Sequence, residues 1–217
     1  MKAVFCMANV ISALEQQKKN KNRINIEING VFAFSLNRIV TAWLRIGQVL
    51  SDQQILLLRQ GDAKETVLQS ALKYLNYRIR SEYEMRTHLV RKGFAMSTID
   101  NVITDLKSRE LISDKVFAKE WVENRCNSKP RGRRMLAYEL KLKRINQEDI
   151  DDSLVNLPDE ITLAIQAGQK VKRHYQNLDS QTLKKKIATH LFRRGFSYED
   201  IKKAITYLCE EVLQKQN

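Results

Sequence analysis

One stretch of this chain occurs three times at a fixed interval. It is LVRKGFAMSTIDNVITDL in the first copy, and the copies begin at Leu89, Leu140 and Leu191, at intervals of 51 residues without a gap. Self-similarity at a fixed period is typical of repeat proteins, in which neighbouring units complete each other's cores. No single copy has enough apolar residues to form a core alone, so we expect the repeats to stack.

Each copy has the pattern of two helices joined by a tight turn. The last helix carries apolar residues at i, i+3, i+4 and i+7, as from Ile99 to Leu106, except that Ser153 takes one of these positions in the second copy. The helix before it ends in the repeated leucine. Gly93 and Gly195 follow, and glycine there favours the left-handed turn that ends a helix. The second copy has Arg144 at this position, so we expect some strain in its turn.

Helix caps are predicted at the start of each last helix. Asn146 and Ser197 each have an aspartate three residues later, as a capping residue often does. In the first copy the best capping residue is Ser97, two positions later, so its first turn is expected to differ.

The N-terminal part has strand patterns instead. Residues 24–28 alternate apolar and polar, Asn29-Gly30 is a strong hairpin signal, and residues 31–36 return with Phe32, Phe34 and Leu36 on one face. Residues 10–14 are a candidate third strand. A short helix is predicted at 53–59, with Ser51 as its cap and Gly61 at its end.

The predicted fold class is mainly α: tandem three-helix, helix-turn-helix-like repeats in an elongated array, preceded by a small N-terminal α+β hairpin module. The expected domains are residues 1–61, 62–111, 112–157 and 158–217. Predicted helices span 63–80, 82–92 and 97–109 in the first copy, with Ser81 as the cap of the second of these and Glu84 three residues after it. In the second copy, 133–143 is the middle helix. Those of the third copy span 160–175, 181–194 and 197–215.

Composition points to an acidic partner. The net charge is +13 over 217 residues, which is typical of proteins that meet nucleic acid, an anionic membrane or an acidic protein. Cys6, Cys126 and Cys209 are distant from one another and odd in number, which favours reduced thiols in a cytoplasm. No apolar run is long enough to span a membrane, and Asn9 and Ser12 interrupt the faintly signal-like start, whose first residue is Met1 or Met7.

No active site is evident. His88 and His190 occupy the same repeat position and are interpreted, like His174, as helix-surface residues, because no HExxH spacing or other ligand set accompanies them. No phosphate-binding glycine loop occurs. Spaced carboxylates are interpreted as caps and solvated faces: Asp100, Asp105, Glu110 and Asp114. We therefore expect no enzyme activity, no cofactor and no metal.

The candidate binding residues are basic clusters on or next to the middle helix of each copy. They are Arg86, Arg91 and Lys92; Arg131, Arg133, Arg134, Lys141, Lys143 and Arg144; and Lys184, Lys185, Arg193 and Arg194. One interpretation is a solvated helix face; the other is a basic surface that binds an anionic polymer or an acidic groove. A helix-turn-helix that reads DNA bases is a third possibility, but the last helices are rich in aspartate, which disfavours insertion among phosphates.

Three segments resemble conserved motifs of the RecX family, bacterial regulators of the recombinase RecA. They are RIRSEYEMRTHLVRKGF (78–94), SDKVFAKEWVENR (113–125) and GRRMLAYELKLKRI (132–145). The segment from Val10 to Leu36 is similar more weakly. Met85, Trp121 and Arg144 depart from the family pattern, and Arg144 puts the geometry of its turn in question.

The resemblance implies a non-enzymatic cytoplasmic protein that binds the RecA filament on single-stranded DNA. It further implies that the protein inhibits ATP hydrolysis and strand exchange, in DNA repair, recombination and the SOS response. We expect a monomer with possible direct DNA contact and no membrane association. The alternative is a stand-alone nucleic-acid-binding protein that uses the basic faces of its helical repeats.

Overall fold

The computed structural model describes residues 8–175 and 178–214, and the side chains up to Cys209. Its backbone forms four strands and nine helices in the described residues. The chain divides into two compact units, one extending to Arg78 together with Met85–Arg109, and the other comprising Ile79–Glu84 and the chain from Glu110 onward. Cys6 and the choice between Met1 and Met7 lie outside the described residues.

The first unit begins with an antiparallel sheet. Strands β1 (Asn9–Gln16), β2 (Arg23–Ile28), β3 (Val31–Asn37) and β4 (Val49–Leu50) lie in the order β3-β2-β1-β4. Asn29 and Gly30 both have positive φ, as a two-residue hairpin turn requires. The predicted hairpin and the third strand are therefore confirmed.

The predicted face of β3 is only partly correct. Leu36 is buried, but Phe32 is exposed, and an irregularity shifts the register between Ile26 and Glu27. Ile26 pairs with Phe34 while its neighbour Glu27 pairs with Phe32. An extra residue in one strand reverses the alternation beyond it, which a strict period of two does not anticipate.

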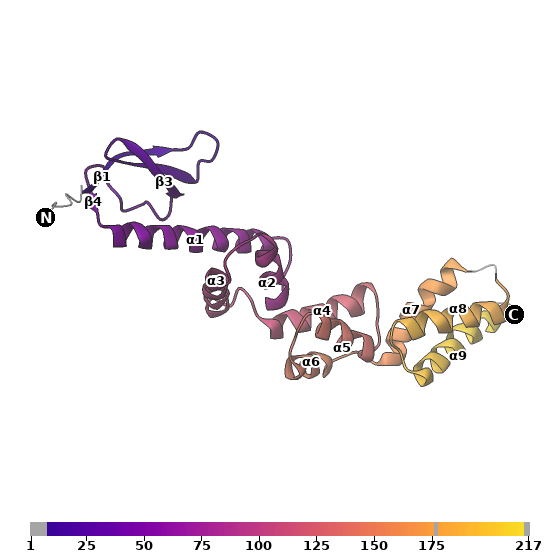
Figure 1. Cartoon of the computed structure of the whole chain (residues 1–217). Coiled ribbons are helices and arrows are strands. Elements are labelled where there is room, and N and C mark those ends of the chain that lie inside the picture. The colour runs from indigo at the N-terminus through magenta and orange to yellow at the C-terminus, as the bar shows by residue number, and fades with distance from the viewer. Residues whose placement is uncertain (1–7, 176–177, 215–217) are drawn as a thin grey trace. The chain divides into compact units, whose positions relative to one another are not determined.

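Helix α1 (Asp52–Leu75) joins the two helices predicted at 53–59 and 63–80 into one, and it ends before the predicted residue 80. Ser51 forms the expected capping box with Gln54, but the helix continues through Gly61, so the prediction that Gly61 ends it is wrong. An interior glycine costs only about 1 kcal/mol. Leu58 on one side of Gly61 is buried in the sheet's core, and Val67 on the other side is also buried. Packing therefore carries the helix past the glycine, and Figure 1 shows α1 lying along the sheet.

The first copy continues with α2 (Glu82–Arg91) and α3 (Met96–Ser108). Ser81 caps α2 as predicted, since its hydroxyl accepts from the Glu84 N–H, and Asp114 accepts from the Glu82 N–H. The prediction of Ser97 as the cap of α3 is wrong: the helix begins one residue earlier, after Ala95, without a side-chain cap. Burial of Ile99 and Leu106 holds this helix instead.

The second unit contains copies two and three. Its helices are α4 (Asp114–Ser128), α5 (Arg133–Leu142), α6 (Gln147–Leu154), α7 (Glu160–His174), α8 (Ser180–Arg193) and α9 (Tyr198–Gln214). One continuous hydrophobic cluster includes buried side chains from all six. The two copies thus share a core, which confirms for this pair the expectation that stacked repeats complete each other.

Candidate interaction surface on the middle helices

The middle helices α2, α5 and α8 occupy equivalent positions in the three copies. Each buries two apolar side chains four residues apart, and these six are fully buried: Met85 and Leu89, Leu136 and Leu140, Ile187 and Leu191. This spacing places both side chains on one face, so the remaining positions point away from the core. The sequence-predicted basic residues lie on and next to these outer faces.

Nine of the thirteen predicted basic residues are solvent-exposed. They are Arg91, Lys92, Arg133, Arg134, Lys141, Arg144, Lys184, Lys185 and Arg193. Arg133 also receives a structural contact, since its backbone N–H donates to the Glu160 carboxylate at 2.8 Å. These side chains are the ones available to an external anion.

The other four have partners within the protein. Arg86 pairs with Asp100, Arg131 with Glu139, and Lys143 with Glu84. The Lys143–Glu84 pair is mostly buried and joins the end of α5 to the start of α2. Arg194, the fourth, is half-buried and is described below. Fewer cations are therefore available to a partner than the thirteen that the sequence predicted.

Glu139 connects the core-facing side of α5 to residues of α4 and of the preceding loop. It accepts hydrogen bonds from Trp121 Nε1 at 2.9 Å and Arg125 Nε at 2.8 Å, and Arg131 Nε lies 2.8 Å from its other oxygen. Arg125 also stacks over the Trp121 ring. Our predicted site omitted Glu139, although it is the only acid in α5 and falls beside the buried Leu140, which was the available signal.

Copies two and three meet where the end of α8 touches the start of α5. The Gly132 N–H donates to the Arg194 carbonyl at 3.0 Å, and Arg194 Nη1 donates to the Pro130 carbonyl at 2.9 Å. A Cβ on Gly195 would lie only 2.6 Å from Met135 Cβ. The contact is between backbones, which explains why glycine occupies both positions.

Two histidines are less exposed than predicted. His190 Nε2 accepts from Arg194 Nε at 2.7 Å, which requires a neutral ring with its proton on Nδ1. Burial, and then the charge of Arg194, lower the pKa of His190. The His88 ring stacks on Tyr74 with centroids 3.9 Å apart. Both rings are therefore partly buried, and the interpretation of both as surface histidines is only partly correct.

Acidic side chains cluster on other helices. Asp100 and Asp105 of α3 pair with Arg86 and Lys64, and Asp152 of α6 pairs with Lys115. Helix α8 contains no acidic residue at all.

Neither a metal site nor a membrane span is found among the described residues. No cluster of three or more metal-ligating side chains occurs there, and no helix is long and apolar enough to span a bilayer. The candidate interaction surface therefore consists of the exposed cations on and next to the middle helices.

Comparison with family models accounts for most of the chain. A model of the RecX regulatory protein N-terminal domain matches residues 9–51, and models of the first, second and third RecX three-helix domains match 68–106, 113–154 and 159–205. The regulatory protein RecX of Bacillus licheniformis is 34% identical over 199 residues, which cover 90% of this chain and 76% of that protein. This chain belongs to the RecX family.

Other RecX proteins agree in sequence and fold. The Bacillus subtilis protein is 30% identical over 95% of this chain and 81% of its own length. A crystal structure of regulatory protein RecX superposes with a TM-score of 0.69 at 27% identity, covering 89% of this chain and 97% of that one. RecX from Lactobacillus salivarius gives 0.58 at 25% identity over 68% of this chain and 97% of that one. An N-terminal domain followed by three three-helix domains is thus the order in which the RecX family models match this chain.

Proposed function

We propose that this protein binds the RecA filament on single-stranded DNA and inhibits its ATP hydrolysis and strand exchange. It acts as a cytoplasmic, monomeric, non-enzymatic regulator in recombination, DNA repair and the SOS response. Membership of a family of regulatory proteins carries this proposal. The exposed cations of α2, α5 and α8 supply the contact, because they are the side chains that an acidic groove or DNA phosphate can reach.

Three cations represent this surface best. Arg134 and Lys141 are exposed on α5, seven residues apart, and Lys185 of α8 is the repeat equivalent of Arg134. Lys143 is excluded from the set, because its mostly buried pair with Glu84 makes any change there a change in stability as well. Exposed positions allow the charge to be altered while the fold is kept.

The experiment is a RecA ATPase assay on single-stranded DNA into which the purified full-length protein is titrated. The proposal predicts a concentration-dependent fall in ATP hydrolysis. Unchanged hydrolysis at a large excess of the protein over RecA would contradict it.

A second candidate function is stand-alone binding of nucleic acid. The net charge of +13 and the absence of acidic residues from α8 favour it. It predicts tight DNA binding without RecA and steep salt dependence. It also predicts that RecA hydrolysis falls only when the protein competes for the DNA.

A further inference from the structure

Two aromatic side chains are exposed among the cations of α5 and α8. The side chain of Phe192, in the last turn of α8, is 73% exposed, and that of Tyr138, in the middle of α5, is 57% exposed. Exposed cations lie near both: Arg134 and Lys141 are four residues before and three after Tyr138, on the same face of the helix, and Arg193 directly follows Phe192. A ring exposed next to cations can stack on a flat group of a ligand while the cations hold the ligand's negative charge.

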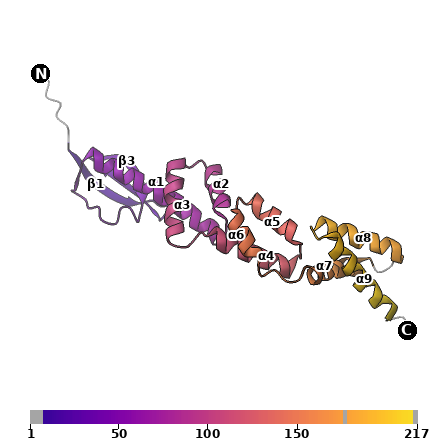
Figure 2. The same cartoon turned by 90° about the horizontal axis from the view of Figure 1, so that it is seen from below.

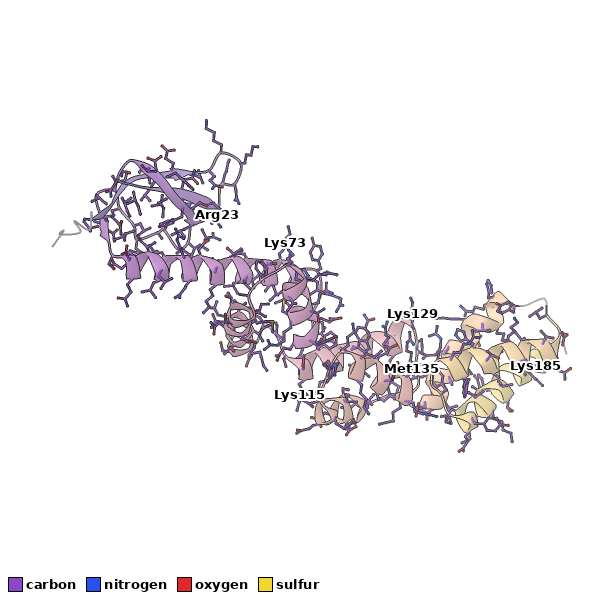
Figure 3. All side chains as sticks on the ribbon, viewed as in Figure 1. Arg23, Lys73, Lys115, Lys129, Met135 and Lys185 are labelled. Carbon is purple, nitrogen blue, oxygen red and sulfur yellow. The ribbon has the colours of Figure 1, made fainter. Side chains whose placement is uncertain are left out.

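Helices α5 and α8 are neighbours at their ends. The end of α8 contacts the start of α5 through Arg194 and Gly132, and both helices bury their apolar faces in the same core. Figure 2 shows α5 and α8 on the same side of the second unit, and Figure 3 labels Met135 and Lys185 on these two helices. We call the surface the α5–α8 track; its residues are Arg134, Tyr138, Lys141, Lys185, Phe192 and Arg193.

The charge of the α5–α8 track has one sign. No acidic residue occurs in α8, and the single acid of α5, Glu139, is turned inward, where it holds Trp121 and Arg125. Nothing on either helix therefore repels an anion along the track. A regular polyanion with flat apolar groups matches both features together, whereas an acidic protein surface accounts for the cations alone.

We propose that the α5–α8 track binds single-stranded DNA, with bases stacked on Phe192 and Tyr138 and phosphates held by the four cations. Single strands present free base faces, whereas in a duplex these faces are stacked on one another. Stacking on an aromatic ring tolerates any base, so the binding is independent of sequence. The inference rests on the proposed function, because it names a ligand for the same basic faces, but its test needs no RecA.

The test is fluorescence anisotropy of the full-length protein with a labelled 20-mer of thymidine. Two competitors of equal length are added: an abasic deoxyribose-phosphate strand and a duplex. The proposal predicts at least tenfold tighter binding to the thymidine strand than to the abasic strand. In the double variant Phe192→Ala/Tyr138→Ala this difference disappears, because only phosphate contacts remain.

Salt dependence separates the two kinds of contact. Four phosphate contacts give a slope of about −3 in log affinity against log salt, at about −0.7 per contact on a single strand. The aromatic variant is expected to keep this slope. The variant Arg134→Gln/Lys185→Gln is expected to reduce it by about 1.4, because two contacts are lost.

Matched controls are Trp43→Ala/Tyr207→Ala, which remove two exposed aromatic side chains outside the track. They should bind like the wild type, and circular dichroism shows whether each variant is folded. Equal wild-type affinity for the thymidine and abasic strands would overturn the proposal. A second result would also overturn it: the wild type does not bind DNA, and the aromatic variant no longer inhibits RecA. That result would leave the proposed function intact and assign the track to a protein partner. Thymidine-strand binding with no effect on RecA would support the track and contradict the proposed function.

Discussion

Glu139 is the residue on which the inner side of α5 depends. It joins Trp121 and Arg125 of α4 and Arg131 of the preceding loop, and its own side chain is only 13% exposed. Its oxygens accept two hydrogen bonds and lie beside the Arg131 guanidinium, so its charge offsets those of two arginines that face inward. We therefore regard Glu139 and its arginines as structural parts of the second copy.

Glu139→Ala should destabilise the fold. The change leaves Arg125 and Arg131, both about one-quarter exposed, without their counter-ion and leaves the Trp121 N–H unpaired. We expect a loss of about 2 kcal/mol in the free energy of unfolding, measured by urea titration with circular dichroism. Lys203→Ala is the comparison, since its exposed pair with Glu199 is screened by solvent and contributes little to stability. Equal effects of the two changes would contradict this role for Glu139.

His190 should make stability depend on pH. Its pKa is lowered from 6.5 in the folded protein, chiefly by burial, so below that pH the unfolded chain binds more protons. The stabilisation is therefore complete above 6.5 and is lost as the pH falls from there toward the lowered pKa. Urea unfolding at pH 7.5 and 5.5 measures it. His190→Gln, which keeps an acceptor for Arg194, should lose less stability over this range; an identical loss would show that other groups are responsible.

Arg144 adopts the backbone conformation of the glycines at the equivalent positions of the other two copies. Its φ is +60°, the same left-handed region as Gly93 and Gly195 at the equivalent positions, as the alignment of the copies predicted. A non-glycine residue pays an energetic cost there. Its guanidinium lies over the Tyr83 ring, at 5.7 Å, which offsets part of that cost. Sequence alone gave no sign of this partner.

At the scale of elements, Gly195 holds two copies together as well as ending a helix. Gly93 and Gly195 have nearly equal φ values of 81° and 83°, but a Cβ on Gly93 would meet nothing within 4 Å, whereas one on Gly195 would meet Met135. The turn geometry is therefore common to both glycines, and the close approach of a neighbouring copy belongs to Gly195 alone.

Alanine at these two positions separates the two requirements. Gly93→Ala should cost about 1–2 kcal/mol, the cost of the left-handed conformation. Gly195→Ala should cost about 3 kcal/mol or more, because overlap with the Met135 backbone is added. Urea unfolding of both variants against the wild type tests this. Equal costs would mean that α5 and α8 do not approach each other closely.

The helix ends show where a local signal decides the structure and where packing does. Capping residues were correct at Ser51, Ser81 and Asn146, where the local hydrogen bond decides the helix start. The prediction of a cap at Ser97 and the prediction of a helix end at Gly61 were wrong, because buried side chains on neighbouring turns decide those positions. Tertiary packing overrides local preference where the local energy difference is about 1 kcal/mol.

For the molecule as a whole, the repeat predicted most of the fold and part of the candidate site. The period of 51 residues implied three copies, and the structure has equivalent helices in each. Which cations are exposed was not predictable, because the partners come from other segments: Glu84 for Lys143, and Pro130 for Arg194. These contacts depend on how copies stack, which composition and spacing do not encode.

We propose that exposed cations of the middle helices carry the inhibition of RecA. The RecA ATPase assay on single-stranded DNA tests this with three proteins: the wild type, Arg134→Glu/Lys141→Glu/Lys185→Glu, and Lys18→Glu/Lys19→Glu/Lys21→Glu. The last set makes the same change of net charge at exposed lysines of the β1–β2 connection. We expect the wild type and the connection variant to inhibit equally, and the middle-helix variant to need at least about tenfold more protein for half-inhibition. Half-inhibition by the middle-helix variant at the same concentration as the wild type would contradict this role of the cations.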